Sequence, residues 1–316
     1  MATYAIFNYQ FDKIINHAQQ PELKGMESVL MTADEAFPRK QELLGIILQK
    51  DYRRERIEDI IHFRNKRNLK EYIHRHLIPP TDDIVVMRVA NRRTQRIVDA
   101  ELKEKPVDDY QNSIVMIDNR PGIQRILIEN KKAAFRDVKQ VADILQYTFI
   151  FLLRPYSLTI TLDHLQDSRD FWHYANDLRI YPNGFHRISF HLPYPNLERL
   201  KKVYNRLVNR TRESFDIRLD MDFTNSEGQV RLNEEDPYQN ELVKWFMEDA
   251  GGNITLYSNL AKRTPIVVGK DSFRFITVSD TTIRRLIEDA ASNDLFGSAA
   301  LDEVKRKLKT GIDSDR

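Results

Sequence analysis

The sequence predicts an α+β protein in which an antiparallel β meander with a long helix precedes a region of alternating strands and helices around a mixed sheet. Three observations indicate this class. Short strand-like segments follow one another between residues 84 and 130, apolar residues recur at helical spacing between residues 135 and 153, and strand-like and helix-like segments alternate after residue 157. A boundary near residue 155 therefore divides the chain into an N-terminal region, residues 1–155, and a C-terminal region, residues 156–316.

The first region is expected to start with a strand at residues 4–15. Helical spacing over residues 42–76 predicts a helix that ends before Pro79-Pro80, because proline cannot continue a helix. The meander strands are expected at residues 84–90, 95–102, 113–118 and 123–130. Asn119-Arg120-Pro121-Gly122 joins the last two, since Pro-Gly is favourable turn chemistry. The long helix at residues 135–153 then ends at Arg154-Pro155.

In the second region, we expect strands at residues 157–162, 186–192, 214–223, 254–258, 266–268 and 273–278. Helices are expected at residues 168–178, 197–208, 237–249 and 282–291, followed by a polar helical tail. Five aromatic residues on two of these helices lie at helical spacing and should pack in the core. They are Phe171, Trp172, Tyr174, Trp245 and Phe246.

The composition excludes several classes of protein and several kinds of site chemistry. The chain has 316 residues, a formal net charge of +2, 41% hydrophobic residues and no cysteine. This length and apolar content suit one large or two ordinary domains, and they exclude disordered and disulfide-rich classes. The lack of cysteine excludes thiolate nucleophiles, zinc thiolates and iron–sulfur clusters. The first residues lack a signal-peptide pattern and the most apolar stretch, residues 141–153, is too short to span a bilayer, so we expect a cytoplasmic protein without membrane association.

Basic residues are concentrated in one segment. Residues 51–96 contain twelve cationic and seven acidic residues. Their net charge is therefore +5, compared with +2 for the whole chain. Arginine dominates, and its planar guanidinium suits phosphate oxygens, so a DNA- or RNA-binding face is one interpretation. A solvated helix with spaced ion pairs is the other. The candidate nucleic-acid-binding residues are Arg53, Arg54, Arg64, Lys66, Arg67, Arg92, Arg93 and Arg96.

The segment Ile126-Leu127-Ile128-Glu129-Asn130-Lys131 resembles the Glu-x-Lys half of the PD-(D/E)xK nuclease motif. That resemblance implies a divalent metal beside the scissile phosphate, held by acids on neighbouring strands. If residues 119–122 form the turn, Asp118 lies opposite Ile123, about 20 Å from Glu129, and Asp108 becomes the feasible partner acid. The candidate catalytic set is therefore Asp108, Glu129 and Lys131, with Mg²⁺ required only in this case. A charged hairpin edge before a helix is the alternative.

No His-Glu-x-x-His pattern identifies a metal site, no cofactor is otherwise evident, and no phosphate-binding glycine loop occurs. The turn Ile117-Asp118-Asn119-Arg120-Pro121-Gly122, the segment Ala133-Ala134-Phe135 and the ending Pro193-Tyr194-Pro195-Asn196 resemble uncharacterised bacterial proteins found with anti-phage defence genes. The resemblance implies a cytoplasmic component that works with partner proteins. Our leading hypothesis is a non-catalytic nucleic-acid-associated or scaffold component of that kind. The alternatives are a metal-dependent nuclease and a pure protein-interaction subunit, with a partner protein or a homo-oligomer expected.

Overall fold

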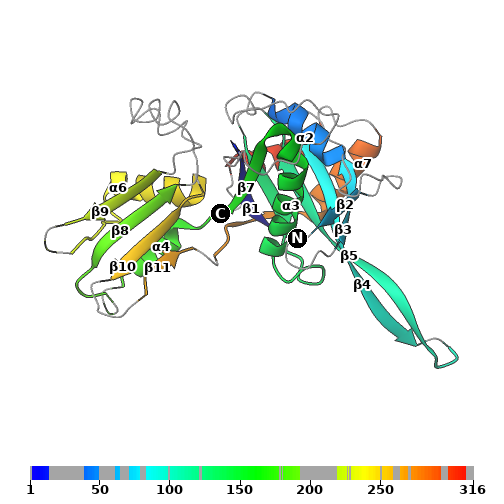
Figure 1. Cartoon of the computed structure of the whole chain (residues 1–316), viewed down its shortest axis with the longest axis horizontal. Coiled ribbons are helices and arrows are strands. Elements are labelled where there is room, and N and C mark those ends of the chain that lie inside the picture. Colours follow the sequence, from blue (N-terminus) through cyan, green and yellow to red (C-terminus); the bar gives the residue numbers. More distant parts are fainter. Residues whose placement is uncertain are drawn as a thin grey trace. The chain divides into compact units, whose positions relative to one another are not determined.

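The computed structural model describes residues 2–13, 39–49, 61–64, 71–78, 83–98, 100–120, 123–177, 179, 181–192, 219–225, 227, 229–249, 251–258, 264–269, 272–292 and 298–310. The chain forms two compact units (Figure 1). Unit 1 comprises residues 1–162 and 275–316, and unit 2 comprises residues 163–274. Among the described helices, none is long and apolar enough to cross a membrane.

Unit 1 is built on an eight-stranded sheet of order β12-β1-β6-β5-β4-β3-β2, with β7 also paired to β1. Its strands are β1 (Ala2–Lys13), β2 (Ile61–Arg64), β3 (Glu71–Ile78), β4 (Ile84–Val98), β5 (Glu104–Asp118), β6 (Arg125–Glu129), β7 (Leu158–His164) and β12 (Phe275–Val278). Successive residues of β6 point to opposite faces, and Ile126, Leu127 and Ile128 are all buried. Both faces of the sheet are therefore covered at this strand.

Four α-helices accompany this sheet in the described part of unit 1. They are α2 (Lys40–Gln49), α3 (Val138–Leu153), α7 (Asp280–Ala291) and α8 (Ala299–Thr310), and the short 3-10 helix η2 (Arg154–Tyr156) follows α3. The side chain of Asp137 caps α3 by accepting a hydrogen bond of 2.8 Å from the amide of Gln140. Val141, Leu145 and Phe149 recur at helical spacing and are buried, as the sequence predicts.

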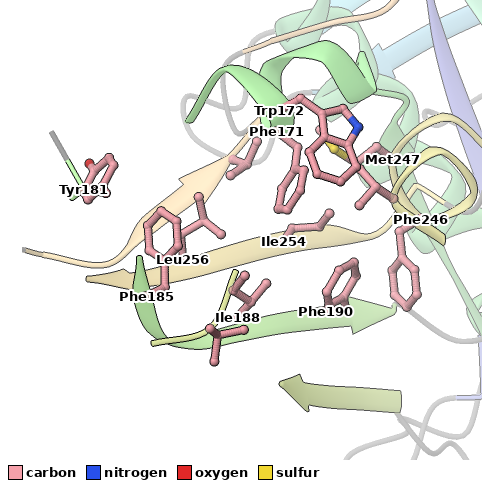
Figure 2. Close-up of a cluster of buried hydrophobic side chains, with 13 residues drawn as sticks. Phe171, Trp172, Tyr181, Phe185, Ile188, Phe190, Phe246, Met247, Ile254 and Leu256 are labelled. Atoms are coloured by element: carbon pink, nitrogen blue, oxygen red, sulfur yellow. The ribbon is translucent and has the colours of Figure 1, made fainter. Parts of the chain in front are cut away.

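Unit 2 contains a four-stranded sheet of order β11-β10-β8-β9. Its strands are β8 (Phe185–Leu192), β9 (Leu219–Thr224), β10 (Asn253–Ser258) and β11 (Ile266–Val268), and its helices are α4 (Ser168–Ala175), α6 (Pro237–Lys244) and the π-helical turn η3 (Trp245–Asp249). Figure 2 shows Phe171 and Trp172 with Phe190, Phe246 and Ile254 in one buried cluster. The amphipathic helices thus cover one face of the sheet.

The α+β class and the antiparallel meander are confirmed. Every described strand pair in the sheet of unit 2 is antiparallel, so the mixed sheet expected there is wrong. The alternation of apolar residues reports which face of a strand is buried and carries no information on the direction of its neighbour. The chain also returns to unit 1 after residue 274, because Phe275–Val278 pairs with Ala2–Ala5; the predicted second region ran on to residue 316.

The helix predicted at residues 42–76 is wrong at residues 61–64 and 71–78, which form β2 and β3, whereas residues 40–49 form α2. Residues 50–60 and 65–70 lie outside the described residues. In β3 the burial has a period of two, with Tyr72 and His74 inside and Arg75 exposed. Because His74 is polar, the sequence does not show an apolar residue at this buried position, and the alternation was not recognised. Tyr174, expected in the core, is 39% exposed, whereas Phe171, Trp172 and Phe246 are buried. The helix predicted at residues 197–208 lies outside the described residues.

The meander has three strands here where the sequence predicted four. The segment expected at residues 84–90 and the first half of the one expected at residues 95–102 belong to one strand, β4, which ends at Val98. It pairs with β5 without interruption from Ile84↔Asp118 to Val98↔Glu104. Asn91-Arg92-Arg93-Thr94, which we placed between two strands, contains neither glycine nor proline. Only Asn91 in this stretch favours a turn, and its side chain instead donates to the carbonyl oxygen of Ala134, so the hairpin is fifteen residues long on each side.

The connection from β5 to β6 is anchored by a buried lysine. Lys40, at the start of α2, is 2% exposed and donates hydrogen bonds to the carbonyl oxygens of Asp118 (3.4 Å), Arg120 (2.6 Å) and Ile123. The Tyr9 hydroxyl donates to the same Asp118 oxygen at 2.9 Å. The Asp118 carboxylate accepts from the guanidinium of Arg120 at 2.6 Å. This network holds the connection wider than a four-residue turn.

We predict that stability depends on pH through Lys40. Burial lowers the pKa of Lys40 from 10.5 to about 8. Between these values the unfolded chain retains a proton that the folded chain has released, so the free energy of unfolding rises with pH, by up to about 3 kcal/mol from this group. Urea unfolding at pH 7 to 9.5 should show this rise in the wild type, and Lys40→Met should remove it. Equal slopes for both proteins would contradict the assignment.

Candidate functional site

The three residues of the predicted nuclease set are not brought together. The ladder between β5 and β6 runs Val115↔Ile128, Met116↔Leu127, Ile117↔Ile126, two residues away from the predicted register. Ile114 therefore faces Glu129, and Asp108 lies six residues farther along β5, about 20 Å away. β5 ends at Asp118 and β6 begins at Arg125, so the connection is two residues longer than the predicted turn, and the ammonium group of Lys40 donates to two of its carbonyl oxygens. One metal ion cannot join Asp108 and Glu129 across that distance.

Glu129 is the last residue of β6 and forms hydrogen bonds with β5 through both its side chain and its backbone. One of its carboxylate oxygens accepts a hydrogen bond of 2.8 Å from the amide of Ile114, and its carbonyl oxygen accepts one of 2.7 Å from the Ser113 hydroxyl. Its partner on β1 is Tyr4, a buried residue whose pKa is raised by burial and, to a lesser extent, by the charge of Glu129. The Glu129 side chain thus supplies the acceptor for the Ile114 amide at the position where the pairing of β5 with β6 ends.

Lys131 does not continue the strand with Glu129. β6 ends at Glu129, and the carbonyl oxygen of Lys131 accepts hydrogen bonds from the amides of Ala134 and Phe135 in a turn before α3. The two-residue spacing that would place Glu129 and Lys131 on one face of a strand is therefore lost. Among the residues that the structure describes, no three histidine or carboxylate side chains are grouped so as to hold a metal ion.

The predicted basic face is only partly described. Arg53, Arg54, Lys66 and Arg67 lie outside the described residues, and so does the side chain of Arg64 at the end of β2. The remaining three arginines, Arg92, Arg93 and Arg96, all lie on β4. Residues 92 and 96 share one face of this strand, whereas residue 93 points to the other face.

These three arginines are engaged within the protein. Arg92 forms an ion pair of 2.8 Å with Asp108, and Arg96 forms one of 3.1 Å with Glu104. The Arg92 guanidinium beside Asp108 holds the pKa of that carboxyl below its ordinary value. Arg93 donates to the carbonyl oxygen of Ala134 at 3.0 Å. Asp108, predicted as a metal ligand, is thus the ion-pair partner of a predicted phosphate-binding arginine.

The outer half of the β4–β5 hairpin is the most distinctive feature of unit 1. Figure 1 shows β4 and β5 continuing beyond the other strands of the sheet. β3 pairs with β4 only up to Ala90, and β6 pairs with β5 only at residues 115–117. We call residues 92–98 and 100–110 the β-arm. Along these two strand segments every residue is exposed except the half-buried Asp109.

Large apolar side chains are concentrated on the β-arm. Nine are exposed in the described part of the chain, and five of them are in the β-arm: Ile97, Val98, Leu102, Val107 and Tyr110. Leu102, at the tip, is 86% exposed and has a φ of 59°. That left-handed conformation favours glycine or asparagine and is costly for leucine. An apolar side chain is therefore presented to solvent at a position where local structure would select a different residue.

The base of the β-arm is held firmly. The side-chain amide of Asn91 donates to the carbonyl oxygen of Ala134 at 2.9 Å, beside the hydrogen bond from Arg93. Below it, Val85, Val86 and Val115 are buried in the sheet. Sequence reasoning missed the β-arm, although one signal was present. Residues 84–98 contain no glycine, proline, aspartate or serine, and this indicates a single long strand despite Asn91.

We predict that Glu129 contributes to stability through its contact with Ile114. Glu129→Ala removes the acceptor for the Ile114 amide and should lower the free energy of unfolding by about 1 to 2 kcal/mol. Glu129→Gln keeps an acceptor oxygen and should lose less. Both variants should act on labelled DNA and RNA with Mg²⁺ as the wild type does. A folded Glu129→Gln protein that loses a Mg²⁺-dependent cleavage would restore the nuclease hypothesis.

Comparison of the chain with protein-family models, curated proteins and solved structures found no match. The role of the β-arm therefore has to be inferred from its own residues.

Proposed function

We propose that the protein is a non-catalytic interaction component of the cytoplasm that binds another protein chain through the β-arm. The observation that carries this proposal is the exposure of Val98 and Leu102 on a two-stranded arm without a covering layer. Two strands alone are marginally stable in water, and a covering surface would supply the missing layer. Burial of one such side chain is worth about 1.5 to 3 kcal/mol.

The charges of the β-arm favour a protein partner over a nucleic acid. Residues 92–110 contain five cations and five acids. The ion pairs Arg92–Asp108, Arg96–Glu104 and Lys103–Glu101 join residues of the arm itself. Binding to phosphates requires a surplus of positive charge that displaces counterions. A partner surface that is apolar at its centre and of mixed charge at its rim fits the arm better.

Nucleic-acid binding remains the competing candidate for residues 51–70, most of which lie outside the described part. It is tested with labelled single- and double-stranded DNA and RNA over a range of salt concentrations. On the protein-interaction hypothesis, the triple substitution Arg92→Ala, Arg93→Ala, Arg96→Ala leaves any binding and its salt dependence unchanged. A flatter salt dependence in this variant would place phosphate contacts on the β-arm and overturn the hypothesis.

The direct test places a photo-cross-linking amino acid at Val98 in cells of the source organism. We expect a protein adduct of discrete mass that withstands nuclease treatment. The matched control carries the same amino acid at Tyr238, which is 85% exposed on α6 in unit 2, and should give no discrete adduct. A nuclease-sensitive adduct, or equal labelling at the two positions, would contradict docking through the β-arm.

We predict that Leu102 favours docking at a cost in stability. Asparagine tolerates the left-handed conformation, so Leu102→Asn should leave the free energy of unfolding equal or higher. The same change removes an apolar side chain from the docking surface and should reduce the adduct formed at Val98 about tenfold or more. Tyr238→Asn is the control for an exposed apolar residue elsewhere. Full adduct formation with Leu102→Asn would exclude the tip from the docking surface.

A further inference from the structure

One face of the β-arm separates its charges by strand. Directly paired residues share a face, and the pairs Arg92↔Tyr110, Thr94↔Asp108, Arg96↔Pro106 and Val98↔Glu104 define this face, which we call the striped face. Its two cations, Arg92 and Arg96, lie on β4, and its two acids, Glu104 and Asp108, lie on β5. Between and beside them lie the apolar side chains of Val98, Pro106 and Tyr110, all exposed.

The opposite face lacks this separation. Arg93 at its base is tied to Ala134, and the Gln95 and Gln111 side chains both donate to the Asp109 carboxylate, at 2.7 and 3.0 Å. Lys105, on β5, also belongs to this face, so cations lie on both strands. Only the striped face combines a cationic strand, an acidic strand and exposed apolar side chains.

The edges of the β-arm are poorly suited to pairing with a further strand. Pro106 interrupts the hydrogen-bonding groups of β5, and three arginines lie on β4 within residues 92–98. Proline and charged residues at strand edges are common devices against edge-to-edge association. The striped face is therefore a better docking surface than either edge.

Symmetry determines which charges meet if two copies of the striped face pack together. When the two-fold axis runs parallel to the arms, both tips point in the same direction and β4 of each copy lies over β5 of the other. When the axis is perpendicular to the strands, β4 lies over β4 and the arginines face one another. Opposite charges attract at this distance and like charges repel, so only the first arrangement is complementary.

We propose that a second copy of this chain is the partner of the β-arm, with striped face against striped face and both tips pointing in the same direction. This inference rests on the proposed function, because it identifies the protein that docks there. Arg92 and Arg96 of one copy then face Glu104 and Asp108 of the other. Val98, Pro106 and Tyr110 of both copies form the apolar centre.

The area of the striped face determines how tightly two copies of the chain are expected to associate. Seven residues per strand give a length of about 24 Å, and two strands give a width of about 10 Å. This area is well below the ~800 Å² that each partner buries in a stable interface. The dimer should therefore dissociate reversibly, and its mass has to be followed from low micromolar to several hundred micromolar chain.

The experiment exchanges the charges of the two strands in the full chain. The swapped variant carries Arg92→Glu, Arg96→Glu, Glu104→Arg and Asp108→Arg, which keeps an ion-pair partner for each residue within the arm. Sedimentation equilibrium should show dimers for the wild type and for the swapped variant. In an equimolar mixture, native mass spectrometry should find far fewer mixed dimers than the half expected from random pairing, because like charges then face one another.

A second design covers the case in which the swapped arm does not fold. Arg92→Glu with Arg96→Glu, and Glu104→Arg with Asp108→Arg, make two chains whose arms carry only one sign on the striped face. Each should dimerise at least tenfold more weakly than the wild type, and the mixture of both should dimerise again. Preferred mixing of wild-type and swapped chains, or a wild type that is monomeric at every concentration, would overturn the proposal.

The outcomes separate this inference from the proposed function. A monomeric wild type whose Val98 adduct contains a different protein rejects the second copy and keeps docking through the β-arm. An adduct with twice the mass of the chain supports both. If no adduct forms at Val98 and the wild type is monomeric, both the docking through the β-arm and the second copy as its partner are rejected.

Discussion

The architecture depends on the uninterrupted antiparallel pairing of β4 with β5. Its inner half lies in the middle of the sheet, with Val85, Val86 and Val115 buried, and its outer half continues the same ladder into solvent. Antiparallel pairing needs no helix to cover it, so a ladder that begins in a core can extend beyond it. The buried half therefore provides the rigid support on which the β-arm is held.

The register of the neighbouring strand depends on a smaller set of polar contacts. The ammonium group of Lys40 occupies the connection between β5 and β6 and binds the Arg120 and Ile123 carbonyl oxygens. A shift of two residues leaves every side chain on its original face and preserves the hydrophobic pattern. For this reason Glu129 lies on the predicted face of β6, although its partner across the ladder is Ile114 and lies two residues from the one that a four-residue turn would give.

Arg92 and Arg96 form ion pairs within the β-arm and therefore do not make a basic surface. In the sequence, Arg92 and Arg96 belong to a basic segment, and their acidic partners lie from eight to sixteen residues later. The hairpin brings the two groups together and leaves a surface whose net charge is close to zero. What remains distinctive is the apolar character of the arm and the distribution of charge between its strands.

The sequence by itself determined the elements that arise from local periodicity and capping. The helix α3, the strands β7, β8 and β10, the helix α7 and the aromatic core of unit 2 were all predictable, because their signals lie within ten to twenty residues. The lack of glycine and proline between positions 84 and 98 also favours one long strand, although we predicted two strands there. The candidate site was not predictable to the same extent. Asp108, Glu129 and the three described arginines were predicted to bind metal or phosphate, and in the structure they form contacts within the protein.

Only the tertiary structure decided which segments are neighbours. The return of β12 to β1, the antiparallel order of the second sheet and the two-residue shift beside Glu129 all depend on pairing between distant segments. Periodicity shows which face of a strand is buried but not which strand lies beside it or in what register. The free energy that selects these partners comes from contacts between residues far apart in the chain, and it is therefore absent from any local pattern.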